Sequence, residues 1–361
     1  MSFLLVFVAH AGLHDYVPGG FGVTVFFFLS GYLITTLLRL EHDSRGTISF
    51  KQFYLRRVLR ILPPFYIVMV VSALAAAVGL IGGGFHPRAL AAQALYYANY
   101  WIVGHGYHGL PSGTGVYWSL AVEEHFYLLF PALYFALRRF LPRKRRAQAL
   151  VLLGMCALVL GWRLVLVYGL HSATDRTYLA TDARVDSILF GCALAVYGNP
   201  AVDGPSRFSD RVWKWGLLPA AVVVLLFTFV YRDPGFRQTF RYSLQGIALA
   251  PLFVAAMRFP SWGPFRLLNL KAVSFLGVRS YSLYLVHFVL LDAIGSEPSL
   301  PRAALGLSLS IAVSYGIYVL VEKPCARLRR RLARISTAAP EAEKAPVRPR
   351  AALVEMEARR S

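Results

Sequence analysis

The sequence predicts an all-α, polytopic membrane protein with about ten transmembrane helices and both termini in the cytoplasm. Of its 361 residues, 57% are hydrophobic and only 16% are charged, whereas about a quarter of the residues in a soluble domain are charged. Apolar stretches recur along the chain with polar breaks between them, which is typical of membrane-spanning helices. We therefore expect a multi-pass protein of the cell inner (plasma) membrane.

Ten apolar segments are candidates for crossing the lipid bilayer. A helix needs about 20 residues to span the hydrocarbon core. The first and sixth segments are short by this measure, and the others satisfy it or come close. The segments lie near residues 2–17, 20–38, 61–83, 117–137, 147–169, 183–198, 213–231, 240–257, 272–292 and 303–322.

The Lys and Arg residues between these segments predict their orientation. Every second loop, together with the C-terminal segment, is basic and carries 29 Lys and Arg residues, against 6 in the alternate loops. Cytoplasmic loops are enriched in these residues, so we place the basic set and both termini in the cytoplasm. Membrane topology thus explains the formal net charge of +20, and we expect no nucleic acid partner.

The chain is expected to form one membrane domain over residues 1–323, followed by a disordered, basic cytoplasmic tail over residues 324–361. The tail is rich in Ala, Pro and Arg and lacks apolar periodicity, as disordered segments do. A solvated anchor near anionic lipid is the simplest role for it.

Ionisable residues are few within the apolar segments and gather in a few places. Such residues normally face a cavity or a partner, because burying them in lipid is costly. The predicted orientation places His10, Glu123 and the Asp182–Asp186 group at similar depth in the outer half of the membrane, where they could meet in a polar cavity. The candidates for the acceptor site or the cavity lining are Glu124, Asp182, Arg184, Asp186, Tyr281 and His287.

Glu123 and Glu124 are adjacent, so their side chains leave a helix about 100° apart. One carboxylate is expected to serve the cavity. The other is expected to pair structurally, with Arg184 or Arg163 as candidates. The cavity could support acyl transfer to a hydroxyl group: an imidazole, His10, takes the hydroxyl proton, and a carboxylate, Glu123, orients it. The alternative is that His10 is only hydrogen-bonded within a helix bundle.

Two arginines precede the third apolar segment, in "FYLRRVLRILPPFY". Arg57 and Arg60 are three residues apart and therefore share a helix face. Two guanidinium groups on one face suit a phosphate-bearing donor such as coenzyme A. Basic residues at the cytoplasmic start of a helix are also what topology alone requires. We see no metal-ligand spacing and expect no bound cofactor.

Several stretches, in order, resemble the acyltransferase-3 family of integral membrane acyltransferases. They are "LLVFVAH", "GGFGVTVFFFLSGYLI", "LRRVLRILPPFY", "YWSLAVEEHFYLLFPALY", "TDARVDSILFGCALA" and "LGVRSYSLYLVH". The resemblance extends from residue 4 to about residue 324.

The resemblance implies transfer of an acyl group, often acetyl, from acyl-CoA to a hydroxyl of a sugar-containing acceptor. It implies that His10 is the essential histidine and that Arg57 and Arg60 serve donor binding. It further implies that Trp118, Ser119 and Glu123 form the motif of the fourth span, and we expect Trp118 and Ser119 at the acceptor site or in the cavity. In many members an arginine lies about eleven residues before the histidine, a position that here falls before Met1. We therefore expect the native chain to begin roughly 10–20 residues earlier, completing the first span.

Other functions are compatible with parts of the pattern. A polytopic transporter would line a path with the same buried charges, but the halves of the chain show no internal repeat. A membrane glycosyltransferase would need acidic residues in an outer loop, and residues 84–116 contain none. An inactive family member, with a truncated N-terminus, is the third alternative.

Overall fold

The computed structural model is helical throughout, and it describes residues 2–204, 206 and 208–342. Within these residues the extended structure is limited to one isolated β-bridge between Gly83 and Pro111. The α-helices are α1 (Ser2–Val8), α2 (Gly19–Arg45), α3 (Phe50–Ala77), α4 (Pro87–Ala94), α5 (Ala98–His105), α6 (Trp118–Phe140), α7 (Arg145–Leu164), α8 (Thr174–Leu179), α9 (Thr181–Arg184), α10 (Asp186–Val196), α11 (Asp210–Val212), α12 (Leu218–Val230), α13 (Pro234–Gln238), α14 (Phe240–Arg258), α15 (Lys271–Val278), α16 (Ser280–Ile294), α17 (Leu300–Ile317) and α18 (Lys323–Ala342). Shorter π and 3₁₀ segments are η1 (Ala9–Leu13), η2 (Thr114–Tyr117), η3 (Val165–Gly169), η4 (Trp213–Leu217), η5 (Gly263–Asn269) and η6 (Tyr318–Glu322).

Seven helices in the described part are long and apolar enough to cross a membrane, which confirms the all-α, polytopic class. They are Gly19–Arg45, Phe50–Ala77, Thr114–Phe140, Arg145–Gly169, Asp210–Val230, Phe240–Arg258 and Leu300–Leu332. An eighth span is possible if α15 and α16, which are bent by 80° at a short break, count as one. The shorter apolar helices Ser2–Leu13 and Asp186–Val196 coincide with the first and sixth predicted segments. Each of the ten predicted segments thus has a helical counterpart.

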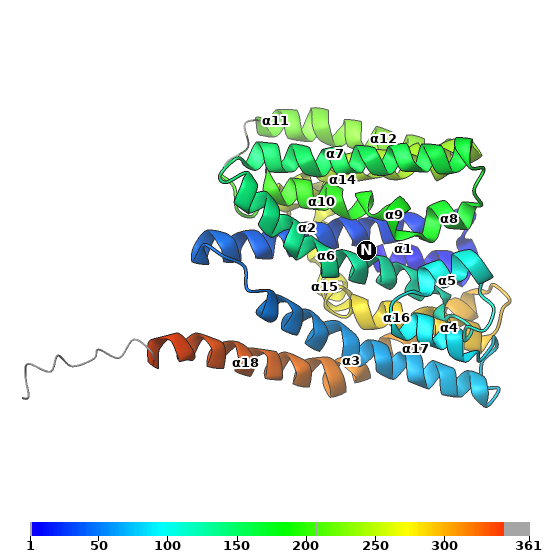
Figure 1. Cartoon of the computed structure of the whole chain (residues 1–361). Coiled ribbons are helices and arrows are strands. Elements are labelled where there is room, and N and C mark those ends of the chain that lie inside the picture. The colour runs from blue at the N-terminus through cyan, green and yellow to red at the C-terminus, as the bar shows by residue number, and fades with distance from the viewer. Residues whose placement is uncertain (1, 205, 207, 343–361) are drawn as a thin grey trace, which may run out of the picture.

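The long helices lie side by side, and the connecting segments sort to the two ends of the bundle (Figure 1). Helices α4, α5 and α8 lie at one end, and α11 and the far end of α18 lie at the other. The first group comes from loops poor in Lys and Arg, and the second comes from the basic set. The two classes of loop therefore occupy opposite ends, as a membrane protein with alternating loops requires.

Helices α2 and α10 approach each other closely at two glycines. A Cβ atom on Gly31 would lie 2.0 Å from the carbonyl oxygen of Ile188, and one on Gly191 would lie 2.0 Å from that of Phe28. Small residues permit such backbone contact between membrane helices. The contact fixes α2, which carries one wall of the cavity described below, against the centre of the bundle.

Helix α18 corrects the prediction that the chain is disordered from residue 324. It runs over Lys323–Ala342, and with α17 and η6 it continues the last candidate span. Ala, Leu and Arg are good helix formers, and extending an existing helix avoids the cost of nucleation. The rest of the predicted tail, residues 343–361, lies outside the described residues.

Candidate functional site

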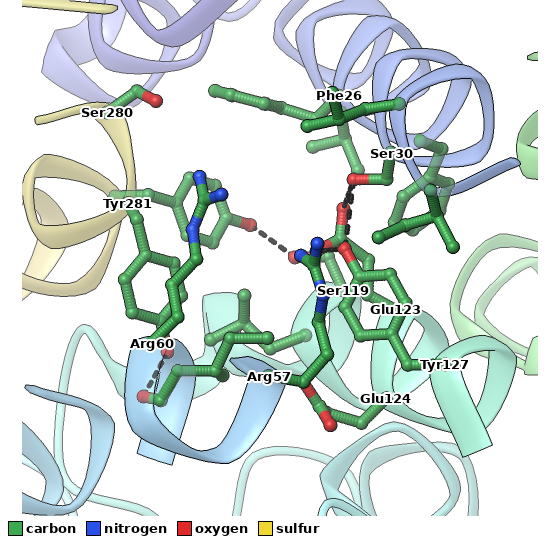
Figure 2. Close-up of a pocket in the computed structure, with 17 residues that line it drawn as sticks. Phe26, Ser30, Arg57, Arg60, Ser119, Glu123, Glu124, Tyr127, Ser280 and Tyr281 are labelled. Carbon is green, nitrogen blue, oxygen red and sulfur yellow. Dashed lines mark hydrogen bonds between the residues drawn. The ribbon is translucent and has the colours of Figure 1, made fainter. Parts of the chain in front are cut away.

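A cavity of about 820 Å³, counting the space at its open mouth, lies between α2, α3, α6 and α16. Its apolar walls come mainly from α2. Figure 2 shows that Arg57 and Arg60 reach from α3 into the space that Glu123 borders from α6. The polar residues that line the cavity are Ser30, Arg57, Arg60, Ser119, Glu123, Glu124, Tyr127, Ser280, Tyr281 and Tyr284.

The predicted arginine pair is present in this cavity. Ser49 caps the start of α3 by accepting a hydrogen bond from the backbone N–H of Gln52, and one helical turn then places Arg57 and Arg60 on the same face. The guanidinium of Arg57 lies 5.4 Å from the centre of the Tyr127 ring. In the described part of the chain, neither arginine has a carboxylate within 4.0 Å. Both charges thus remain available to an anionic ligand.

Both glutamates line the cavity, which corrects the prediction that only one of them would. Glu123 accepts hydrogen bonds from Ser30 Oγ at 2.8 Å and from the Tyr127 hydroxyl at 3.2 Å. The cavity extends over two neighbouring faces of α6, so a separation of 100° does not carry Glu124 out of it. The proposed partners Arg163 and Arg184 make their hydrogen bonds elsewhere.

His10 pairs with another histidine and not with Glu123. Its Nδ1 lies 2.9 Å from Nε2 of His287, and its ring stacks on Phe288 with 4.3 Å between ring centres. Among the described residues, the hydrogen-bond partners of Glu123 are Ser30 and Tyr127. The predicted contact between His10 and Glu123 is therefore wrong, because the segment carrying His10 faces α16 while Glu123 faces α2 and α3.

The hydrogen bonds of His287 determine the tautomer of His10. Nδ1 of His287 lies 2.8 Å from the carbonyl oxygen of Tyr284, and a carbonyl can only accept, so this nitrogen carries the hydrogen. Nε2 of a neutral His287 is then an acceptor, and His10 must donate to it from Nδ1. The Nε2 atom of His10 is left with a free lone pair, which is what a general base requires.

Tyr284 connects the histidine pair to the cavity. Its carbonyl holds His287, its ring lines the cavity, and its hydroxyl lies 2.7 Å from Ser119 Oγ. Tyr281 also lines the cavity and donates a hydrogen bond from its hydroxyl to the carbonyl of Ile61 at 2.8 Å. The predicted residues Ser119, Tyr281 and His287 therefore belong to the cavity or to its immediate surroundings.

Besides His10 and His287, four predicted residues do not line this cavity. Asp182 accepts hydrogen bonds from Arg176, Trp162 and Tyr100. Trp118 is buried with its ring centre 4.9 Å from that of Tyr178. The other two are Arg184 and Asp186.

Asp186 and Arg184 are fully buried but do not pair with each other. Asp186 forms an ion pair with Arg163 at 2.7 Å. Arg184 lies over the ring of Tyr242, 4.0 Å from its centre. Asp182, Arg184 and Asp186 therefore do not meet Glu123 in its cavity, since successive positions of α9 and α10 meet different neighbouring helices.

Four polar residues of the site were not predicted from the sequence: Ser30, Tyr127, Ser280 and Tyr284. All but Ser280 had a recognisable signal. Ser30 is a polar residue in an apolar span, Tyr127 follows Glu123 by one helical turn, and Tyr284 precedes His287 by three residues on the same face.

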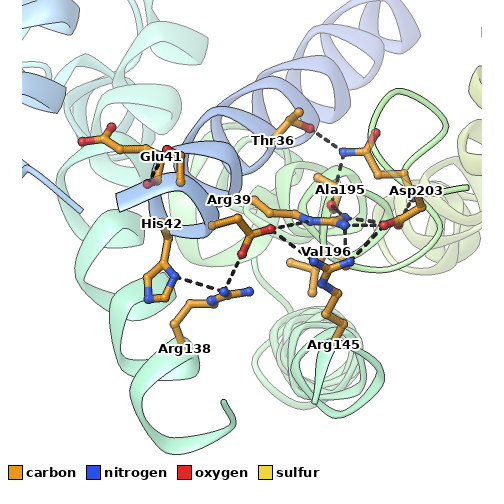
Figure 3. A network of polar contacts seen from close by, with 12 residues as sticks. Thr36, Arg39, Glu41, His42, Arg138, Arg145, Ala195, Val196 and Asp203 are labelled. Atoms are coloured by element: carbon orange, nitrogen blue, oxygen red, sulfur yellow. Dashed lines mark hydrogen bonds and ion pairs between the residues drawn. The ribbon is translucent and has the colours of Figure 1, made fainter. Parts of the chain in front are cut away.

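A second polar network lies away from the cavity and joins α2, α6, α7 and the loop after α10 (Figure 3). Arg39 donates hydrogen bonds to Asp203, and Arg145 bridges Asp203 and Asp43 at 3.2 Å each. Arg138 lies 2.6 Å from Asp43. The network pairs its charges internally, so it serves helix packing and not ligand binding.

Comparison with known proteins identifies the family. Residues 1–319 match the family described as "Acyltransferase domain". The chain belongs to the acyltransferase-3 family. This confirms the resemblance seen in the sequence. The protein is therefore a membrane acyltransferase.

Several curated proteins are similar to this family member. Peptidoglycan O-acetyltransferase OatA of Listeria monocytogenes is 29% identical over 335 residues, which cover 86% of this chain and 52% of the relative. A putative O-acetyltransferase of Staphylococcus aureus is 28% identical, with coverage of 86% and 53%. The putative peptidoglycan O-acetyltransferase YrhL of Bacillus subtilis is 31% identical, with coverage of 76% and 44%. The chain thus spans about half the length of these relatives. No solved structure matches it.

Proposed function

We propose that this protein is a membrane O-acyltransferase that moves an acetyl group from acetyl-CoA to a hydroxyl of a glycan or glycosylated metabolite. The observation that carries the proposal is the cavity in which Arg57 and Arg60 share the space with Glu123 and have no carboxylate partner among the described residues. Family membership and the names of the relatives support it. Peptidoglycan, which appears in two of those names, is the first acceptor to test.

Donor binding is assigned to the arginine pair. The diphosphate of acetyl-CoA would accept charge-assisted hydrogen bonds from Arg57 and Arg60. The pantetheine arm would then extend along the apolar wall formed by residues such as Phe26 and Leu120. No resident cofactor or metal is needed for this chemistry.

Transfer is assigned to His10. Its Nε2 takes the proton of the acceptor hydroxyl while the oxygen bonds to the thioester carbonyl carbon. The C–S bond then breaks, and the departing thiolate of coenzyme A takes the proton from the imidazolium of His10. His287 holds His10 in the reactive tautomer. Glu123, hydrogen-bonded to Ser30 and Tyr127, borders the same cavity.

We infer the topology from the same observations. Ten crossings, in a plasma membrane, would use the seven long helices, the bent pair α15–α16 and the two short helices. The basic loops support a topology in which both termini and the start of α3, near Arg57, lie in the cytoplasm, where acetyl-CoA is found. Residues 1–323 would form the membrane domain, and residues 324–361 a basic cytoplasmic extension that begins with α18.

A direct assay tests the proposed function. Purified full-length protein in detergent is given radiolabelled acetyl-CoA and soluble peptidoglycan fragments, and the label on the saccharide is measured. We expect acceptor-dependent transfer and release of free coenzyme A in equal amount. A transporter would leave the thioester intact, so the absence of coenzyme A release in the presence of any glycan acceptor would exclude the proposal. Glycan mass spectrometry of cells with and without the gene then names the natural acceptor.

A further inference from the structure

A second cavity lies at the end of the bundle that carries α8 and α13. It has a volume of about 980 Å³, counting its open mouth. Its walls come from the segment His14–Phe21, from α8, from the end of α12 and from α13 and α14. Three arginines line it: Arg232, Arg237 and Arg241.

These three arginines lie in a loop of the set that otherwise carries few Lys and Arg residues. Loops of the less basic set carry 6 Lys and Arg residues in total, and three of the six are these arginines, within residues 231–241. The topology predicted from the other loops puts this segment on the outer side, where positive charge is disfavoured. Topology therefore does not account for the cluster.

The three guanidinium groups are close together and are not neutralised by carboxylates. Partial burial, and then the positive charges of Arg241 and Arg232, lower the pKa of Arg237. In the described part of the chain, none of the three has a carboxylate within 4.0 Å. Asp15 also lines the cavity, but its carboxylate lies 3.6 Å from Nε2 of His14.

A fourth positive charge lies beneath the cavity floor. Tyr178 and Tyr242 line the cavity, and the buried guanidinium of Arg184 lies 5.3 Å and 4.0 Å from the centres of their rings. Arg184 is fully buried and has no carboxylate within 4.0 Å among the described residues. Its charge is screened little by water, so it raises the positive potential of the cavity.

We propose that this cavity binds an oxyanion, a carboxylate or phosphate group, carried by the glycan acceptor on the outer side of the membrane. The inference rests on the proposed function, since it names the class of acceptor: an acidic saccharide. The wall at His14–Pro18 begins four residues after His10 along the chain. An acceptor anchored by its anion would therefore lie beside the segment that carries the general base.

Binding can be measured without acetyl-CoA. The probes for isothermal titration calorimetry of the full chain in detergent are inorganic phosphate, a tetrasaccharide containing glucuronic acid, and the same tetrasaccharide after reduction of its carboxyl groups. We expect the acidic sugar to bind more tightly than the reduced one. The double variant Arg237→Gln/Arg241→Gln should weaken binding of the acidic sugar by about tenfold or more, the effect of losing one or two charge-assisted hydrogen bonds.

Matched variants separate charge from folding. Arg88→Gln removes an exposed arginine of α4 that does not line the cavity, and it should leave binding unchanged. Arg237→Lys/Arg241→Lys should retain most of the affinity for the acidic sugar, and thermal unfolding should be the same for all variants. Equal binding of the acidic and reduced sugars, or undiminished binding by the glutamine variant, would overturn the proposal.

Two further results distinguish the remaining explanations. If nanodiscs with anionic lipid abolish binding of the acidic sugar and zwitterionic nanodiscs do not, the occupant is a lipid headgroup and the glycan assignment is wrong. Acetyl transfer that is intact, with no binding of acidic sugars at this cavity, defeats this inference alone. Binding that is intact, with no acetyl transfer, defeats the proposed function alone.

Discussion

His10 Nδ1 and His287 Nε2 lie 2.9 Å apart although 277 positions separate the two residues in the chain. The contact joins the first helical segment to α16, and it gives His10 a donor position at Nδ1 and a free lone pair at Nε2. The orientation of the His10 ring is thus set by a second histidine and not by a carboxylate.

Replacing His10 by alanine should abolish acetyl transfer while the protein is still expressed and folded. The substitution removes the atom that takes the acceptor proton, whereas the loss of a half-buried imidazole costs little packing. Transfer of labelled acetyl groups, compared with wild type at equal protein, is the measurement. Normal turnover by this variant would end the proposed mechanism.

Replacing His287 by phenylalanine keeps a ring in the buried site but removes the acceptor for His10 Nδ1–H. We expect kcat to fall by about 10–100-fold, the usual effect of losing a partner that orients a functional histidine. The KM for acetyl-CoA should not change, because His287 does not line the donor cavity. A change in KM alone would show that the residue acts on donor binding instead.

Arg57→Gln and Arg60→Gln should each lower kcat/KM for acetyl-CoA by about 10–100-fold, mainly through KM, since each removes a charge-assisted hydrogen bond to phosphate. Arg56→Gln is the matched control, because Arg56 pairs with Glu41 at 2.9 Å and does not line the cavity. The measurement is the kcat and KM for acetyl-CoA of the three variants, from steady-state kinetics. Equal effects in all three would point to general electrostatics.

The arginine pair shows what could be predicted from the sequence. Arg57 and Arg60 share a face because three residues make nearly one turn, and this holds wherever the helix lies. The ten apolar segments were found for the same local reason. The prediction of a contact between His10 and Glu123 was wrong because such a contact depends on how distant helices rotate and pack against one another. Local spacing does not contain that information.

Neighbours in sequence can also mislead. Asp182 and Asp186 are near one another along the chain, yet one accepts hydrogen bonds from Arg176 and the other from Arg163. The partner of Arg184 is the ring of Tyr242, and no spacing rule foresees an arginine held by aromatic rings. The helix over Lys323–Ala342 was missed because its composition is typical of disordered tails as well as of helices.

Asp186→Asn should destabilise the protein by about 3–5 kcal/mol, because it leaves the charge of Arg163 buried without a partner. Both side chains are fully buried and 2.7 Å apart. The double variant Arg163→Met/Asp186→Leu should recover most of this loss, since it removes both charges together. Thermal unfolding in detergent compares the stability of wild type and the two variants. An Asp186→Asn variant as stable as wild type would contradict the prediction.

The contribution of Asp203 to stability should depend on pH in the acid range. Partial burial by itself raises the pKa of Asp203, but hydrogen bonds from Arg39 and the Asn199 N–H, with the charges of Arg39 and Arg145, bring it below its usual value. Its stabilising effect is therefore complete above the unfolded pKa of about 3.9 and is lost as pH falls through the lower folded pKa. The difference in unfolding temperature between wild type and Asp203→Asn should be constant near neutral pH and shrink in acid. A difference that grows in acid would contradict this.

The contact of Gly31 and Gly191 with facing carbonyl oxygens limits where the protein can change shape during a reaction cycle. Backbones packed this closely leave little room for sliding, so we expect α2 and α10 to move as one body. Ser30 and the α2 wall of the cavity would then stay still. Under the proposed function, any widening that releases coenzyme A would come from displacement of α3, α6 or α16, which form the other walls.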